Sequence, residues 1–170
     1  INDFYLEFAM EYWSEILSKV EIDWVMIWED MAFKTGSFVS KETFKEFLTP
    51  YYLKFVDFLK QFGVKNIIVD CDGLVEELIQ LWLETGVTGI FPMEAVNDLI
   101  KIRENFPKLQ MLGGVDKRIL IKNDQRSIDK ELEKISPIIK AGGFIPHIDH
   151  SIPMDADWHL FNEYREKLNN

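Results

Sequence analysis

The sequence has little cysteine, a deficit of cationic side chains and no long apolar run. Its single cysteine, Cys71, cannot form a disulfide within the chain, so a reducing, cytoplasmic setting is the simplest interpretation. The 19 Lys and Arg against 29 Asp and Glu give a net charge of −10, which disfavours nucleic acids and anionic membranes as partners. No apolar run reaches the roughly 18–20 residues that span a bilayer, and no signal-peptide pattern is present.

The sequence also lacks the glycine-rich motifs that bind nucleotides. Neither Gly-x-Gly-x-x-Gly nor a Walker-type phosphate loop occurs, so no nucleotide cofactor is expected. What is present is enough apolar material for a core, since 47% of the 170 residues are hydrophobic. We therefore expect a single domain over 1–170. The chain starts with Ile1 and runs directly into an apolar helical pattern, from which we expect residues upstream of Ile1 to be missing.

The first third of the chain predicts a helix, a strand and two further helices. Apolar residues with a period near 3.6 predict a helix over 2–19, and a continuous apolar run predicts a strand over 24–28 that is buried on both faces. A loop over 29–39 follows. Ser40 is expected to cap the next helix, and Thr49-Pro50 to cap and begin another that stops before Gly63.

The remaining chain alternates short strands with amphipathic helices. The expected strands are 66–69, 87–91, 109–112 and 143–148, and the expected helices are 74–85, 94–105, 126–140 and 157–168. Five strands alternating with helices predict consecutive βα units and an α/β fold with a parallel sheet. A closed barrel takes roughly 200 residues or more, so two architectures remain: a compact open sheet, or the C-terminal five βα units of a TIM-type (βα)8 barrel. The start at Ile1 favours the second.

Acids or a histidine follow the expected strands where each strand ends. The segments are 28–30, 70–73, 113–117 and 147–150. Polar groups at the carboxyl ends of parallel strands converge on one place, which in α/β proteins is the usual active site. These segments therefore predict an active site at this end of the sheet.

The segment Asp70-Cys71-Asp72 contains two carboxylates on one face of a strand. Side chains alternate along a strand, so Asp70 and Asp72 share a face and Cys71 points to the other side. Two like charges so close repel unless a cation, a basic partner or a proton intervenes. The alternative is structural: Asp72 caps the helix over 74–85 and Asp70 forms a salt bridge.

All three histidines of the chain lie between positions 147 and 159. His147 and His150, with Asp149 between them, combine imidazole and carboxylate, which suits acid–base chemistry or a divalent ion. The alternative is a hydrogen-bonded loop before Pro153. His159 falls inside the last helix, where a surface or packing role is expected.

Three further segments offer acids or cations at the strand ends. Paired glycines precede Asp116, which either meets a ligand or caps a helical turn over 117–122. Lys117 and Arg118 either hold an anionic substrate group or are solvated. Glu29-Asp30 and Glu94 are either acids at the site or helix caps, and Glu94 would lie in the first turn of the helix over 94–105.

These segments, in this order, resemble the C-terminal half of the uroporphyrinogen decarboxylase superfamily. The matching segments are 29–32, 47–51, 72–73, 113–116 and 149–150. That superfamily is a (βα)8 barrel and includes the porphyrinogen decarboxylase and the corrinoid/coenzyme M methyltransferases. The resemblance covers roughly 22–168. The segment 142–153 looks most like the methyltransferase-like branch.

The resemblance implies roles for individual residues. Asp30 lies where the decarboxylase has a substrate-contacting serine, and His150 matches a histidine that binds a substrate carboxylate, so both are expected to be catalytic. In the methyltransferases His-x-Cys and a later Cys hold zinc; the matching positions here are Asp70, Asp72 and His150, which suit zinc or another divalent metal. The residues expected to bind substrate are Glu29, Glu94, Asp116, Lys117 and His147.

Three functions follow as expectations. The first is metal-dependent methyl transfer to a small-molecule substrate, with a corrinoid carried by a partner protein. The alternative is cofactor-free decarboxylation of a porphyrinogen, as in porphyrin biosynthesis, which needs cations that the acidic strand ends do not offer. A third is a non-catalytic barrel fragment that self-associates as a homodimer through exposed strand edges. We expect the full-length protein to be an enzyme and this fragment alone to be inactive.

Overall fold

The computed structural model describes residues 1–121 and 124–169 and separates into two compact units, Ile1–Ile90 and Phe91–Asn170. Strand β5 (Gly89–Met93) contains the boundary. The main strands are hydrogen-bonded in the order β1-β4-β5-β6-β7, so each lies beside its successor along the chain. That order contains no reversal, as in a segment of a (βα)8 barrel and unlike a doubly wound sheet. The α/β class is confirmed, and the single domain stays a prediction.

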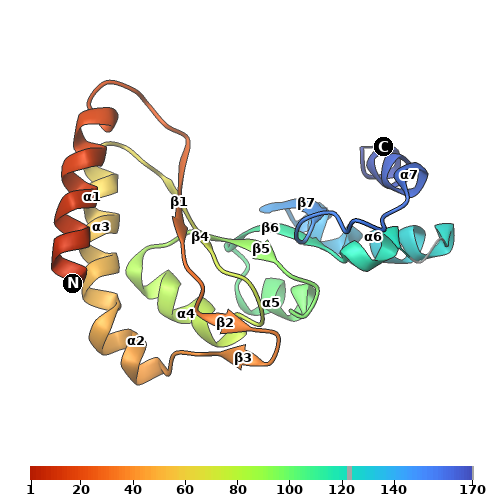
Figure 1. Cartoon of the computed structure of the whole chain (residues 1–170), viewed down its shortest axis with the longest axis horizontal. Helices are drawn as coiled ribbons and strands as arrows, with labels where there is room; N and C mark the ends of the chain where they lie inside the picture. Colours follow the sequence, from red (N-terminus) through yellow and green to blue (C-terminus); the bar gives the residue numbers. More distant parts are fainter. Residues whose placement is uncertain (122–123, 170) are drawn as a thin grey trace. The chain divides into compact units, whose positions relative to one another are not determined.

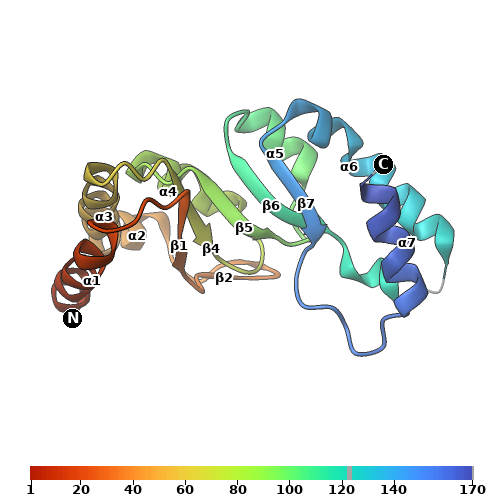
Figure 2. The same cartoon turned by 90° about the horizontal axis from the view of Figure 1, so that it is seen from above.

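The first unit is built on two parallel strands and four helices. Strand β1 (Trp24–Trp28) pairs in parallel with β4 (Asn66–Asp70). The helices are α1 (Asn2–Leu17), α2 (Lys41–Phe47), α3 (Thr49–Gln61) and α4 (Glu76–Thr85). Figures 1 and 2 both show α1 running alongside α3. No helix in the described parts of the chain is long and apolar enough to cross a membrane.

The helix ends around Pro50 agree with the sequence in part. The Ser40 hydroxyl accepts a 3.1 Å bond from the amide of Thr43, which confirms the expected cap of α2. The expected Thr49 cap is wrong, because the N-cap of α3 is Leu48 and its backbone is already helical. An N-cap that accepts amide bonds through its side chain needs an extended backbone, so α3 continues almost directly from α2. Pro50 in the first turn and Gly63 after the end, at φ +82°, are confirmed.

One face of β1 is exposed, which corrects the expectation of burial on both faces. Val25 is buried, whereas Trp24, Met26 and Trp28 are 47%, 36% and 80% exposed. Side chains alternate along the strand, so helices cover the face of Val25 and Ile27 and the other face carries the tryptophans. A continuous apolar run cannot distinguish a strand buried on both sides from one that leaves an apolar face open.

The segment expected as a loop over 29–39 contains a small antiparallel hairpin, β2 (Ala32–Phe33) with β3 (Gly36–Ser37). It packs on the turn after β4: the Leu74 amide donates to the Phe33 carbonyl at 3.0 Å, and a Cβ on Gly73 would lie 2.8 Å from the Phe33 backbone. Helix α4 has Val75 as its N-cap and no side-chain cap. The N-cap of this helix is therefore Val75 and not Asp72.

The second unit contains the parallel pair β6 (Gln110–Val115) and β7 (Phe144–Ile148). Its helices are α5 (Leu99–Asn105), α6 (Gln125–Ala141) and α7 (Trp158–Leu168), with a 3₁₀ turn η1 (Lys117–Leu120) after β6. Figure 2 shows α6 lying beside α7. The expected strands and helices are present, with shifted ends.

Two of those shifts change the setting of candidate residues. The strand expected over 87–91 lies two residues later, and α5 begins at Leu99, capped by Asp98, whose carboxylate accepts from the Lys101 amide at 3.2 Å. Glu94 is therefore in a turn and not in the first turn of a helix, which corrects that alternative. Asp116 caps η1 as its structural alternative predicted. The last expected position of that turn, 122, lies outside the described residues.

Candidate active site

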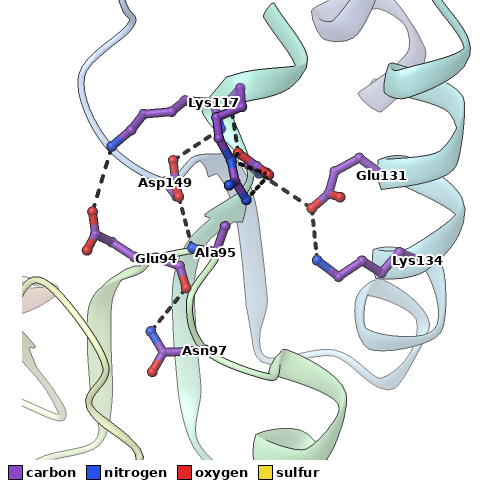
Figure 3. Close-up of polar contacts among 9 residues, drawn as sticks. Glu94, Ala95, Asn97, Lys117, Glu131, Lys134 and Asp149 are labelled. Carbon is purple, nitrogen blue, oxygen red and sulfur yellow. Dashed lines mark hydrogen bonds and ion pairs between the residues drawn. The ribbon is translucent and has the colours of Figure 1, made fainter. Parts of the chain in front are cut away.

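Asp149 organises the strand ends of the second unit. It is only 3% exposed, and its carboxylate accepts from the amide of Ala95 at 2.9 Å and from the amide of Lys117 at 3.2 Å (Figure 3). Its own amide donates to the Val115 carbonyl at 2.9 Å. One side chain after β7 thus fixes the loops that follow β5 and β6. A buried carboxylate that lost these donors would be costly, so Asp149 is a positioning residue.

Glu94 and Lys117 face each other from the two loops that Asp149 holds. Their charged groups lie 3.7 Å apart, and both side chains are partly buried (Figure 3). The Glu94 carbonyl also accepts from the amide and the side-chain nitrogen of Asn97, at 2.9 and 3.0 Å. Asn97 is buried, so the turn that carries Glu94 is fixed from inside. The structure brings together these two expected substrate-binding residues.

The other cation at these strand ends is also paired. The Arg118 guanidinium binds both carboxylate oxygens of Asp116, with Nη2 2.7 Å from Oδ2 and Nε 2.8 Å from Oδ1. This bond to Asp116 raises the pKa of Arg118. The Asp116 amide donates to Glu131 at 3.4 Å, and Glu131 pairs with Lys134 at 3.2 Å. Asp116 therefore caps a turn and neutralises Arg118, and its expected role in substrate binding stays a prediction.

His147, within β7, and His150, just after it, differ in which ring nitrogen carries the proton. Nδ1 of His147 lies 2.7 Å from the carbonyl of Ile148, which can only accept, so the proton is assigned to Nδ1 and Nε2 is the acceptor. Nδ1 of His150 accepts from the Ser151 amide at 2.7 Å, so in the neutral ring Nε2 carries the proton. His147 also packs against the ring of Phe91, with centroids 5.5 Å apart. His147 therefore offers a base and exposed His150 a hydrogen-bond donor.

In the first unit, Asp70 and Cys71 lie on opposite faces of the sheet. Asp70 is in register with Trp28 and shares its face, and Asp70 and Asp72 are half-buried. Cys71 is fully buried, and its sulfur accepts from the Met31 amide at 3.4 Å. Burial raises the pKa of the Cys71 thiol to about 11. A buried thiol with a raised pKa is a poor nucleophile and a poor metal ligand. This agrees with the expectation that Cys71 points away from Asp70 and Asp72.

Glu29 points away from the face that carries Asp70. Its carboxylate accepts a 2.7 Å bond from the hydroxyl of Tyr52 on α3, and its amide extends the β1–β4 pairing by donating to Asp70 at 2.7 Å. Burial, and to a smaller extent the charge of Asp30, raise the pKa of Glu29 against the opposing effect of the Tyr52 bond. Burial also raises the pKa of Tyr52 well above its usual value. Asp30 itself is exposed.

The expected metal ligands are divided between the units: Asp70 and Asp72 lie in the first, and His150 lies in the second. The roles given to these and the other candidate residues stay predictions. Sequence reasoning missed the structural role of two residues at the candidate site. Asp149 was considered only together with the two histidines, for acid–base or metal chemistry, and not as the residue that holds the neighbouring loops, although an acid directly after a buried strand was a usable signal. Nothing in the sequence connects Tyr52 with Glu29, 23 positions earlier.

The strand ends thus combine carboxylates with two imidazoles of different tautomers, which suits proton transfer, a bound cation, or both. A family model described as Uroporphyrinogen decarboxylase (URO-D) matches residues 3–164. That range contains both parallel strand pairs and every candidate residue named above. A search among curated proteins found no match.

Proposed function

Because the chain belongs to the uroporphyrinogen decarboxylase family, we propose that the full-length protein is an enzyme of methyl transfer within that superfamily. In this proposal the protein binds a divalent metal, and a corrinoid carried by a partner protein supplies the methyl group to a small thiol. The family match supports the superfamily. The methyl donor and acceptor rest on the resemblance of the segment 142–153 to the methyltransferase-like branch.

The observation that carries the choice of reaction is the charge balance at the strand ends. Both cations of the second unit's strand ends are already matched, Lys117 with Glu94 and Arg118 with Asp116. A polycarboxylate such as a porphyrinogen needs cations aimed at its acids. An acidic site instead favours a cation, and carboxylates with imidazole are common ligands of divalent metals.

The metal would be held by Asp70, Asp72 and His150. The two carboxylates flank Cys71 at the end of β4, and the buried thiol of Cys71 does not compete for the ion. His150 fits the donor set with one condition: coordination through Nε2 needs the proton on Nδ1, so the present bond from the Ser151 amide must be released. When bound, such a metal lowers the pKa of a thiol, which is then deprotonated and nucleophilic near neutral pH.

The protein's own groups would bind and orient the reactants. Asp149 holds the turn of Glu94 and the start of η1 in fixed positions, so that Glu94 and Lys117 meet the substrate as an ordered pair. His147, with Nε2 as an acceptor, would take the thiol proton. Asp30 is exposed after β1 and would contact the substrate, as the resemblance implies.

The proposal is tested by methyl transfer from methylcobalamin to 2-mercaptoethanol in the full-length protein with added Zn²⁺. We expect turnover that falls at least tenfold in Asp70→Asn, as is typical when a metal site is perturbed. Asp57→Asn, the same change on the exposed side of α3, is the matched control and should retain the rate. A metal-independent rate, or equal rates in Asp70→Asn and the control, contradicts the proposal.

A second candidate, decarboxylation, is favoured by one observation. Nε2 of His150 is a donor in the present tautomer and would suit a substrate carboxylate. Incubation of the full-length protein with uroporphyrinogen distinguishes the two. Turnover that is lost in His150→Ala would replace methyl transfer by this candidate, and we expect no turnover.

A further inference from the structure

A cavity of about 540 Å³ that is open to solvent lies in the first unit, on the helix-covered side of β1. It is bounded by α1, by α3 and by the end of β1, and its walls include Tyr5, Ala9, Trp28, Glu29, Tyr52 and Phe55. Its size falls within the range of roughly 300–1,000 Å³ that is usual for small-molecule sites. Because Glu29 faces away from Asp70, this cavity is separate from the face on which methyl transfer is proposed.

The polar end of the cavity is rigidly held. The Tyr52 hydroxyl donates to the Glu29 carboxylate at 2.7 Å, and Tyr52 is only 6% exposed. Its ring stacks on that of Phe44 at a centroid distance of 5.8 Å, and Phe44 is completely buried against Trp82. The Glu29 backbone is fixed by its bond to Asp70. The carboxyl group is therefore preorganised and does not need to move to meet a ligand.

The composition of the walls defines what would fit. None of the described residues that line the cavity is a Lys, Arg or His, so an anionic ligand would face Glu29 without a compensating charge. Tyr5 and Phe55 supply aromatic walls, which pack well on flat rings and attract cations over their faces. An apolar cavity with one acidic anchor is the arrangement that recognises a hydrophobic amine.

We propose that this cavity binds a small molecule in which a flat apolar ring carries a primary amine, with the ammonium group on Glu29 and the ring between Tyr5 and Phe55. Burial raises the pKa of Glu29, and a bound ammonium group would oppose that shift by favouring the carboxylate. The site serves as a binding site on the helix side of the sheet, independent of the metal and of methyl transfer.

The probes are three naphthalenes that differ in one group: 2-naphthylmethylamine, 2-naphthylmethanol and 2-naphthoate. Binding to the full chain is measured near neutral pH by ligand-detected NMR and by calorimetry. We expect saturable binding of the amine, at least tenfold weaker binding of the alcohol, and no binding of the carboxylate.

Three variants locate the site. Glu29→Gln keeps the shape of the anchor and removes its charge, so amine binding should weaken at least tenfold while alcohol binding changes little. Ala9→Trp fills the cavity from α1 and should abolish binding of both. Glu7→Gln makes the same charge change on an exposed position of α1 and should leave both affinities unchanged. Circular dichroism of each variant checks the fold.

Saturable amine binding that Glu29→Gln weakens and Glu7→Gln spares supports the site, even if Ala9→Trp does not fold. The proposal is overturned if the parent does not bind the amine, if the carboxylate binds as well as the amine, or if Glu29→Gln and Glu7→Gln bind equally. Loss of methyl transfer does not affect any of these results, so the two proposals fail separately.

Discussion

Each unit has an acid at a strand end, Asp149 buried in the second and Glu29 half-buried in the first, and the two acids differ in their partners. In the second unit, the Asp149 carboxylate receives two backbone amides from two loops, and its burial is compensated by these bonds. In the first unit, Glu29 receives one phenol and faces an apolar cavity, so burial raises its pKa. Asp149 is therefore part of the scaffold, whereas the carboxylate of Glu29 can still accept a hydrogen bond or bind a cation.

The largest effect is expected where the acid is part of the scaffold. Asp149→Ala leaves two partly buried amides without their acceptor, at about 1–2 kcal/mol each, so we expect a loss of about 2–4 kcal/mol in the free energy of unfolding. Urea denaturation measures it. Asp155→Ala, an exposed acid of the same unit, should change stability by less than about 0.5 kcal/mol. Equal stabilities of the two variants would contradict the claim that Asp149 is part of the scaffold.

The buried thiol of the first unit gives the next test. With the pKa of Cys71 raised from 9.0 to about 11, the thiolate population is about 100-fold smaller than for a thiol with the ordinary pKa. Alkylation by iodoacetamide near pH 8 should therefore be at least 100-fold slower in the native chain than in urea. A native rate within a few-fold of the unfolded rate would mean that this side of β4 is open to water.

The pH dependence of stability should reveal Glu29. A carboxyl group whose pKa is raised on folding binds more protons when folded, so stability falls as pH rises from the unfolded pKa through the raised one. Glu29→Gln removes this titration and keeps an acceptor for Tyr52. Relative to the parent, it should gain stability between about pH 4 and neutral pH, as followed by urea denaturation.

Tyr52→Phe sharpens that test. It removes the one bond that lowers the pKa of Glu29, so the loss of stability with rising pH should extend to higher pH than in the parent. A stability difference between the parent and Glu29→Gln that does not change with pH would contradict the contrast between the units.

The smallest effect is expected at Arg118. Its side chain is 66% exposed, so its ion pair with Asp116 is screened by water and Arg118→Ala should cost less than about 1 kcal/mol. Asp116→Ala also removes the cap of η1, which is worth about 0.5–2 kcal/mol, and should cost more. A larger loss in Arg118→Ala than in Asp116→Ala would show that the ion pair, and not the cap, orders this strand end.

The order of strands and helices could be predicted from the sequence because it depends on local periodicity and on turn residues such as Ser40 and Gly63. The first and last residues of the helices were harder to predict. Thr49 was expected to cap α3, but the backbone of the preceding residue is already helical. The N-cap of α5 is Asp98 and not the earlier acid Glu94. The open face of β1 could not be predicted, since an apolar run has the same appearance whether one or two faces are covered.

Side-chain alternation correctly separated Cys71 from its acidic neighbours, because the period of a strand is fixed. The same rule placed Glu29 opposite Asp70 only once the register of β1 and β4 was known. The partners of Glu29 and Asp149 come from elements 23 and more positions away, which no local pattern encodes.

The most direct test of the acidic strand ends as a cation site is metal binding by the chain itself. Equilibrium dialysis against Zn²⁺ and Mn²⁺, followed by metal analysis, should show one ion per chain. Binding should be lost in Asp70→Ala and in Asp72→Ala and retained in Asp57→Ala. No bound ion, or equal binding in all three variants, would contradict the metal site and the methyl transfer that depends on it.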